Sequence, residues 1–529
     1  MTKQLPLLII LFAASTAAAT QVIFQKRYGG AADDRGFSVQ QTNDNGYITV
    51  GYTNSFGADT TDVYLIKTNS NGDTLWTKTF GGINVDQGNC VQQTLDGGYI
   101  ITGNTYSFGA GNSDVYLIKT DINGDALWTK TYGGADDDGG LFVQQTTDSG
   151  YIVTGYASSF DAGFEEVYLI KTNSSGDTLW TKTYGGGNST SNSNEVHQTF
   201  DGGYIVTGYT SLNAGNFDVY LIKTNSAGNA TWTKKYGSAS HDYGNSVQQT
   251  TDSGYIVTGE TDGFGAGNAD VYLIKTDANG DTLWTRTYGG SLFDAGYSVK
   301  QTSDGGYIVA GLTYSFFGTG STSDVYLIRT NSFGDTLWTK TFGGVSIDEG
   351  HSVQQTTDGG FIVSGFTWPF LGSVKYDSYL IKCDSSGYSN CNDNYPASVV
   401  NKPSTIVAVP STVVSSASTV VSAAATIEGR GGNVTTMCIT VGYPEIPASN
   451  SFTISPNPSA GHFVISFERT LEKGNIEIYN ILGENIFTEN ITNESKEEIT
   501  VNNVSSGIYL VKVSDEKKQY NGKLIIDRD

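Results

Sequence analysis

The chain has 529 residues, among them 66 Gly and 32 Tyr but only 2 Met and 9 Pro. This composition favours many short strands joined by tight turns, so the expected fold class is all-β. The formal net charge of −23 would repel a phosphate backbone, which argues against nucleic acid as a partner.

The first residues have the pattern of a signal peptide over residues 1–19. Lys3 precedes an apolar run from Leu7 to Ala14, and small residues end at Ala17-Ala18-Ala19, just before Thr20. We therefore expect the mature chain to begin near Thr20. No later stretch has the roughly 20 apolar residues that cross a bilayer, so no transmembrane segment is expected.

One segment recurs along residues 20–392. Each copy contains four strand-like runs separated by turn signals, which is typical of a propeller blade. The sequence therefore predicts a seven-bladed β-propeller of four-stranded blades. The aromatic residue of its Gly-Tyr-Ile marker occurs seven times, 51 to 54 residues apart, at Tyr47, Tyr99, Tyr151, Tyr204, Tyr255, Tyr307 and Phe361.

The order of the runs also predicts how the ring closes. The chain enters with a strand of the tryptophan-containing type, Val22 to Tyr28, while the seventh copy ends near Lys382 without such a strand. The N-terminal strand is therefore expected to complete the last blade, which removes an exposed sheet edge. An open solenoid is the alternative, but neither end of the array has the polar cap that a solenoid needs.

Two motifs resemble a repeat of bacterial secreted seven-bladed β-propellers. They are YLIKTDINGDALWTKTYGG, from Tyr116 to Gly134, and SDGGYIVAG, from Ser303 to Gly311. The resemblance spans about Phe24 to Lys382. It implies the fold, but it implies little about activity.

Residues 393–449 differ in composition, being rich in Ser, Thr and Val. We expect a linker, with an additional strand pair stapled by Cys438 as the alternative. Of the four cysteines, Cys90 is predicted to be a lone buried thiol. Cys391 is expected to pair with Cys438 in preference to Cys383.

Residues 450–529 resemble the type IX secretion system C-terminal sorting domain of Bacteroidetes-type bacteria, a small β-sandwich. The resemblance implies the type IX machinery as a partner, a secreted or outer-membrane-surface location, and removal of this domain during export. Attachment to surface lipopolysaccharide is one implied fate. An immunoglobulin-like accessory domain is the alternative. The motif residues are Pro456, Asn457, Pro458, Gly461, Gly483, Gly507, Tyr509 and Lys523.

A repeated Asp-x-Gly motif opens the first strand of most blades, and Ser191 replaces the aspartate in the fourth copy. A ring of carboxylates near the central channel could bind calcium, which takes six to eight oxygen ligands. Alternatively, each aspartate caps its own turn. The candidate metal ligands are Asp34, Asp86, Asp138, Asp242, Asp294 and Asp348.

Aromatic residues recur in the Gly-rich loop that follows the second strand. If exposed, they could stack on sugars or anchor a protein; alternatively, they pack between blades. The candidate binding residues are Phe56, Phe108, Phe160, Phe264, Phe317, Phe370 and Trp368.

Departures from the repeat are the other place to search for function. They include Glu195 and His197 in copy four, His241 in copy five and His351 in copy seven, and they share no catalytic spacing. The sequence thus predicts a secreted or cell-surface propeller that binds a glycan or a protein. An extracellular polysaccharide-degrading enzyme and a structural surface protein are the alternatives.

Overall fold

The computed structural model describes three parts of the chain. These are residues 21–389 except 58–59, 161–163, 186–188, 213–214, 317–321 and 369–374; the backbone of the strands between 393 and 441; and residues 452–526 except 458, 472, 481–483, 503, 506 and 516–518. The chain divides into a propeller unit, Gln21–Val441, and a C-terminal unit that follows it. The predicted signal peptide lies outside the described residues.

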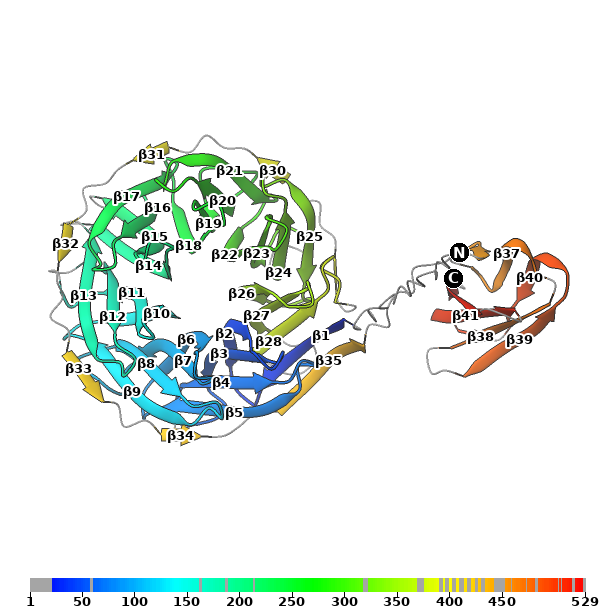
Figure 1. The fold of residues 1–529 in the computed structure, drawn as a ribbon, viewed down its shortest axis with the longest axis horizontal. Helices are drawn as coiled ribbons and strands as arrows, with labels where there is room; N and C mark the ends of the chain where they lie inside the picture. The colour runs from blue at the N-terminus through cyan, green and yellow to red at the C-terminus, as the bar shows by residue number, and fades with distance from the viewer. Residues whose placement is uncertain are drawn as a thin grey trace, which may run out of the picture. The chain divides into compact units, whose positions relative to one another are not determined.

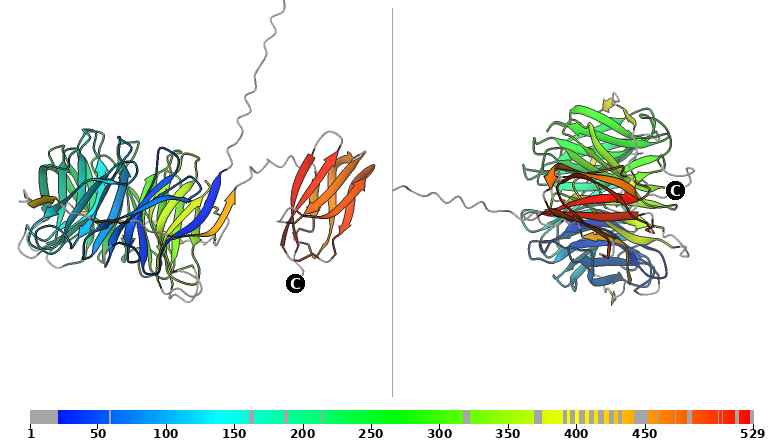
Figure 2. Two further views of the ribbon diagram at one scale, coloured as in Figure 1. Left: turned by 90° about the horizontal axis from the view of Figure 1, so that it is seen from below. Right: turned by 90° about the vertical axis from the view of Figure 1, so that its right-hand side faces the viewer.

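The propeller unit is a closed ring of seven antiparallel sheets, as Figure 1 shows. Blades 1 to 6 each comprise four consecutive strands, starting from β2. Blade 7 contains β26, β27 and β28, and β1 completes it, which confirms the predicted closure. Seen edge-on in Figure 2, the strands run between the two faces of the ring.

The innermost strand of each blade lines the centre of the ring, and the second strand pairs with it on its outer side. The innermost are β2 (Asp34–Gln41), β6 (Asp86–Gln93), β10 (Asp138–Gln145), β14 (Ser189–Gln198), β18 (Asp242–Gln249), β22 (Asp294–Gln301) and β26 (Asp348–Gln355). The second are β3 (Tyr47–Thr53), β7 (Tyr99–Thr105), β11 (Tyr151–Ala157), β15 (Tyr204–Leu212), β19 (Tyr255–Thr261), β23 (Tyr307–Thr313) and β27 (Phe361–Thr367).

The third and fourth strands lie progressively farther from the axis. The third are β4 (Asp62–Thr68), β8 (Asp114–Thr120), β12 (Glu166–Thr172), β16 (Asp218–Thr224), β20 (Asp270–Thr276), β24 (Asp324–Thr330) and β28 (Asp377–Cys383). The fourth are β5 (Thr74–Gly81), β9 (Ala126–Gly133), β13 (Thr178–Gly185), β17 (Ala230–Gly237), β21 (Thr282–Gly289), β25 (Thr336–Phe342) and β1 (Val22–Gly29).

The core lies between adjacent blades. The Val-Tyr-Leu-Ile run of the third strand is buried throughout, because one blade covers each of its faces. The Trp76 ring of blade 1 packs edge-on against Tyr99 of blade 2, with centroids 5.8 Å apart. At the closure, Phe24 of β1 makes the same contact with Tyr47 at 6.0 Å. Phe24 therefore fills the place of the missing tryptophan.

The segment predicted to be a linker is instead part of the propeller unit. After blade 7 the chain runs back around the ring, and its strands pair with the outermost strand of each blade in reverse order (Figure 1). We call these strands the belt. Their β-branched residues suit strand pairing, and the outer edges supply free backbone groups. The belt strands are β29 (Asp393–Asn394), β30 (Val399–Asn401), β31 (Ile406–Ala408), β32 (Val413–Ser415), β33 (Val420–Ala423), β34 (Ile427–Gly429) and β35 (Asn433–Val441).

The C-terminal unit is a small sandwich of two antiparallel sheets, as predicted. Its core includes Phe463, Ile476 and Val511, all fully buried. One sheet holds β36 (Phe452–Ser455), β37 (His462–Leu471) and β40 (Glu494–Thr500). The other holds β39 (Asn485–Ile491), β38 (Gly474–Tyr479), β41 (Gly507–Asp515) and β42 (Gln519–Ile526).

Within the described residues, Cys90 is a buried free thiol, as predicted, and its sulfur lies 3.7 Å from the carbonyl oxygen of Val143. The proposed Cys391–Cys438 pairing lies outside the described side chains. The structure describes no helix long and apolar enough to cross a membrane.

Candidate functional site: the central channel

The predicted ring of aspartates is buried in the loops that enter the inner strands. One carboxylate oxygen of Asp34 accepts hydrogen bonds from the Gly30 N–H and the Ser55 hydroxyl, both at 2.7 Å, and the other accepts one from Thr53. Asp86, Asp138 and Asp294 make equivalent bonds to their own loops. This geometry is that of a turn cap. Among the described residues, no three acidic, histidine or cysteine side chains converge as metal ligands.

A second carboxylate, buried or half-buried at the start of the third strand of the preceding blade, lies next to each of these aspartates at six blade junctions. Around Gly133, for example, Asp114 and Asp138 are so close that an added Cβ would collide with an oxygen of each. Burial raises the pKa of Asp114 to about 6, and the charge of Asp138 adds to that shift. Burial also raises the pKa of Asp324 and of Asp348 to about 7. The pairing was missed because the sequence does not show that the third strand of one blade begins beside the first strand of the next blade.

Four of the predicted phenylalanines pack onto the blades. Phe56, Phe108, Phe160 and Phe264 are half-buried, and each lies 5.3 to 5.9 Å from a core tyrosine of its own blade. In blade 6 the ring with this contact is Phe316, at 5.6 Å from Tyr326. Phe317 and Phe370 lie outside the described residues, and Trp368 packs against Tyr376 at 5.2 Å. We therefore do not place the ligand surface on these rings.

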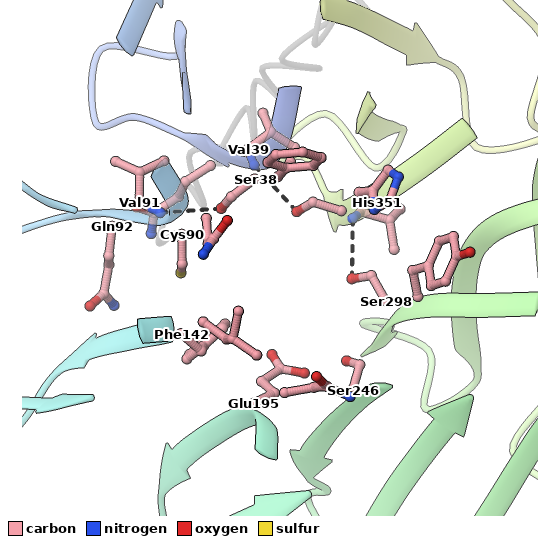
Figure 3. A pocket seen from close by; sticks show the side chains of 18 of the residues that line it. Ser38, Val39, Cys90, Val91, Gln92, Phe142, Glu195, Ser246, Ser298 and His351 are labelled. Atoms are coloured by element: carbon pink, nitrogen blue, oxygen red, sulfur yellow. Dashed lines mark hydrogen bonds between the residues drawn. The ribbon is translucent and has the colours of Figure 1, made fainter. Parts of the chain in front are cut away.

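Each inner strand instead contains a β-bulge, and the extra residue of every bulge lines the central channel. A bulge re-aims a side chain and is common beside functional sites. The cavity that these residues line has a volume of about 260 Å³. Figure 3 shows side chains from all seven inner strands around it. The bulge residues are Phe37, Asn89, Leu141, Asn194, Asn245, Tyr297 and His351.

Three neighbouring bulges, in blades 6, 7 and 1, carry rings that touch one another, and we call them the aromatic arc. Tyr297 and His351 stack nearly parallel at 7° with centroids 4.7 Å apart, and Phe37 meets His351 edge-on at 5.3 Å. The His351 Nε2 atom lies 3.1 Å from a carboxylate oxygen of Glu349, which fixes the ring. The channel wall is therefore aromatic on one side.

The bulges of blades 2, 4 and 5 carry asparagines instead. Asn89, Asn194 and Asn245 each donate a hydrogen bond to a glycine carbonyl of the next blade, at 2.9 to 3.0 Å. These bonds direct the amide nitrogens toward the next blade and leave the amide oxygens as acceptors. The channel thus has an aromatic side and an amide side.

In the inner strands, side chains that follow the bulge residue accept hydrogen bonds from the backbone of the next blade. The Val91 N–H donates to the Ser38 hydroxyl at 3.3 Å, and the Gln93 N–H donates to the Oε1 atom of Gln40 at 2.5 Å. Equivalent bonds occur at other junctions. They satisfy backbone groups on the inner edges, which would otherwise be free to pair with another strand.

Three charged or titratable residues interrupt this pattern in blades 4 and 6. Buried Glu195 replaces a serine, while His197 and Lys300 replace glutamines. One Glu195 oxygen lies 2.8 Å from Lys300 Nζ and 2.7 Å from His197 Nε2, and the other accepts the Val247 N–H. Burial would raise the pKa of Glu195, but Lys300 and His197 outweigh it and hold the pKa well below its usual range.

A more open hollow of about 470 Å³ adjoins the channel at Tyr297. Phe293, Leu312, Tyr314 and Glu349 also line it. Nearby, burial and the charge of Asp262 raise the pKa of Glu260 to about 7. Burial raises the pKa of Tyr297, and the charges of Glu349 and Glu260 add to that shift. Of the departures from the repeat, Glu195, His197 and His351 thus reach the channel, while His241 packs against Phe217 at 5.5 Å.

The sorting motif ties the first turn of the C-terminal unit to its last strand. The Ile525 N–H donates to the Asn457 side chain at 2.8 Å, and the Ser459 N–H donates back to the Ile525 carbonyl at 2.9 Å.

The other residues of the sorting motif have separate roles. Gly461 has a φ of +104°, which favours glycine, and the Tyr509 hydroxyl donates to the Ser505 carbonyl. Pro456 is exposed and Gly507 begins β41. Pro458, Gly483 and the side chain of Lys523 lie outside the described residues.

Comparison with known proteins identifies the C-terminal unit. Residues 453–527 match the secretion system C-terminal sorting domain. The chain is therefore exported by the type IX pathway and is secreted or held at the cell surface.

One protein sequence and two solved structures are also similar to the chain. The regulatory protein FlaEY of Caulobacter vibrioides is 31% identical over 147 residues, which are 25% of this chain and 15% of that protein. A fungal alcohol oxidase of the AA5 family, solved with copper, has a TM-score of 0.42 at 10% identity, over 96% of this chain and 99% of the oxidase. The extracellular domain of a hybrid two-component system of B. thetaiotaomicron has a TM-score of 0.28 at 8% identity, over 93% of this chain and 68% of that domain's chain. The fold assignment rests on the strand pairing itself.

Proposed function

We propose that this exported propeller is a binding protein that holds a glycan or protein ligand in its central channel. The observation that carries the proposal is the ring of bulge residues. The blades repeat one another closely in their strands, yet the bulge position holds Phe, Asn, Leu, Tyr and His. A side chain that only completed a blade would not need this variety. An asymmetric ring of aromatic and amide groups is suited to orienting one ligand.

The aromatic arc supplies the apolar part of such a site. Phenol, imidazole and phenyl rings bury much area with few rotatable bonds, so they bind sugar faces or protein side chains at low entropic cost. The hollow at Tyr297 extends this surface out of the channel. A ligand larger than the 260 Å³ cavity would thus have one residue in the channel and the remainder in the hollow.

Polysaccharide hydrolysis is a second candidate, favoured by Glu349, which lines the hollow, and by Glu260, whose charge contributes to the raised pKa of Tyr297. Glycosidases use two carboxyl groups, and the general acid needs a raised pKa. Glu260, with its pKa raised to about 7, suits that role. Turnover that disappears in Glu260→Gln while binding persists would establish this second candidate.

The proposal is tested by screening the exported chain on glycan and surface-protein arrays and then measuring affinity for each hit. The double variant Tyr297→Asn/His351→Asn introduces the residue that the bulges of blades 2, 4 and 5 already carry. We expect it to weaken binding by at least about tenfold, as the loss of aromatic anchors does. Leu95→Thr is the matched control, because Leu95 is 83% exposed and blades 3, 5 and 7 have Thr there. Equal affinities in both variants would reject the channel as the site.

A further inference from the structure

The hydrogen bonds between neighbouring inner strands determine how the channel glutamines are oriented. Gln40, Gln92, Gln248 and Gln354 each accept a backbone N–H of the next blade at 2.5 to 2.7 Å. A backbone N–H is only a donor, so the accepting atom must be Oε1 and the remaining atom must be the Nε2 amide. The backbone donors therefore fix which atom of each side-chain amide is the oxygen and which is the nitrogen.

Gln144 supports this assignment independently. Its Oε1 accepts the Gln198 N–H at 2.7 Å, and its Nε2 lies 3.2 Å from Nδ1 of His197. Since His197 Nε2 faces a Glu195 oxygen at 2.7 Å, it carries the proton and Nδ1 is the acceptor. Both contacts thus require the same orientation of the Gln144 amide.

The result is a ring of side-chain donors at one level of the channel. Among the described residues, the Nε2 groups of Gln40, Gln92 and Gln354 have no protein hydrogen-bond partner, and these side chains line the cavity. Lys300 stands at the same position of blade 6 and adds a positive charge; it is half-buried and gives one hydrogen bond to Glu195. Ammonium and amide N–H groups together form the donor set that binds an anion.

The charge balance of the channel differs from that of the whole protein. The chain carries a net charge of −23, yet Glu195 is the one carboxylate among the described residues that line the channel. The oxygens of Glu195 already accept hydrogen bonds from Lys300, the Val247 N–H and His197. An anion entering the channel therefore meets donors and a neutralised carboxylate, while acidic residues elsewhere repel it.

We propose that the channel binds the acidic unit of a glycan, a sugar that carries a carboxylate or a sulfate. The anionic group is held by Lys300 and the glutamine amides, and the sugar ring lies against the aromatic arc above them. The cavity of about 260 Å³ is slightly smaller than a typical pocket of about 300–1,000 Å³, which suits one sugar unit. This inference rests on the proposed function and specifies its ligand class.

The test is calorimetric titration of the full exported chain with three oligosaccharides of equal length: a uronate, its carboxyl-reduced neutral form and a sulfated form of that neutral sugar. We expect the uronate or the sulfated sugar to bind at least about tenfold more tightly than the neutral one, with affinity falling as salt rises above about 0.15 M. The two anionic sugars distinguish carboxylate from sulfate.

The key variant is Glu195→Ser/His197→Gln/Lys300→Gln, which gives blades 4 and 6 the residues found in most other blades. It removes the Lys300 ammonium together with its Glu195 partner, so no buried carboxylate is left unpaired. We expect it to lose the preference for the anionic sugar while its melting temperature stays near that of the parent. Lys235→Thr is the matched control, because it removes a lysine on the outer strand where five blades have Thr.

The outcomes separate the two proposals. If neutral and anionic sugars bind equally and Tyr297→Asn/His351→Asn abolishes both, the channel is a binding site but the anionic ligand class is wrong. If an acidic peptide binds and no acidic sugar does, the glycan class is wrong. If no compound binds in a way that the channel variants alter, both the proposed function and this inference fail.

Discussion

Lys300 of blade 6 reaches past the inner strand of blade 5 and places its Nζ atom 2.8 Å from a carboxylate oxygen of Glu195 in blade 4. The pair therefore links blades that do not neighbour each other. Because Glu195 is buried, the bond stabilises a charge that the repeat does not otherwise contain.

Removing Lys300 alone should destabilise the propeller. Breaking a buried ion pair costs roughly 3–5 kcal/mol when no partner remains. In Lys300→Ala, buried Glu195 keeps His197 and the Val247 N–H as partners. We therefore expect the free energy of unfolding to fall by less than that range. Glu195→Ser/Lys300→Ala, which leaves no buried carboxylate unpaired, should unfold close to the parent midpoint. Urea denaturation of the parent, both single variants and the double variant measures the coupling; additive losses would show that the two side chains act independently.

Phe24 should be essential for ring closure. Phe24 is fully buried and replaces tryptophan at the junction of blades 7 and 1. Phe24→Ala should cost about 3–5 kcal/mol through the cavity it leaves, whereas Phe24→Trp restores the residue of six other copies. Thermal unfolding compares the two. An alanine variant as stable as the parent would mean that blade 7 holds together without this contact.

Acidification should stabilise the propeller between about pH 8 and pH 5. Asp324 and Asp348 have folded pKa values raised to about 7, and Asp114, Asp270 and Asp377 have values raised to about 6. A raised pKa means that the folded state binds protons more tightly, so this stability is present at low pH and is lost as the pH rises through the folded pKa.

The measurement is the melting temperature across that pH range. Asp324→Asn removes one titrating group and should flatten the curve and raise the midpoint at pH 8, because the amide cannot ionise. Asp121→Asn is the control: its folded pKa is lowered, so it titrates below this window. A parent curve that rises from pH 5 to pH 8 would contradict the role assigned to the carboxylate pairs.

The belt should protect the outer edge of the ring. Its last strand, β35, pairs with β1 over eight residue pairs, from Val22 with Val441 to Gly29 with Asn433. A chain that ends before residue 433 should exchange the amides of β1 faster and associate through the exposed edge. Hydrogen exchange and light scattering test this against a chain that ends after Val441. Unchanged exchange in β1 would mean that the belt contributes no protection.

The repeat made the blades predictable, but not the belt or the channel. The Tyr-Leu-Ile run recurs in all seven blades and the tryptophan in six, so blade number and closure follow from the sequence. The belt strands have as few as two residues, too short to show an alternating pattern. The bulge residues stand out only when the register of the inner strand is known. The four described phenylalanines of the Gly-rich loops pack against their own blades, which the sequence alone does not show.

Hydrogen–deuterium exchange of the exported chain, with and without a saturating array hit, tests whether ligand occupies the channel at the bulge ring. We expect protection of the inner-strand segments Asp294–Gln301 and Asp348–Gln355, with little change in the outer strand Thr74–Gly81. Protection confined to outer strands, with the inner strands unchanged, would contradict it.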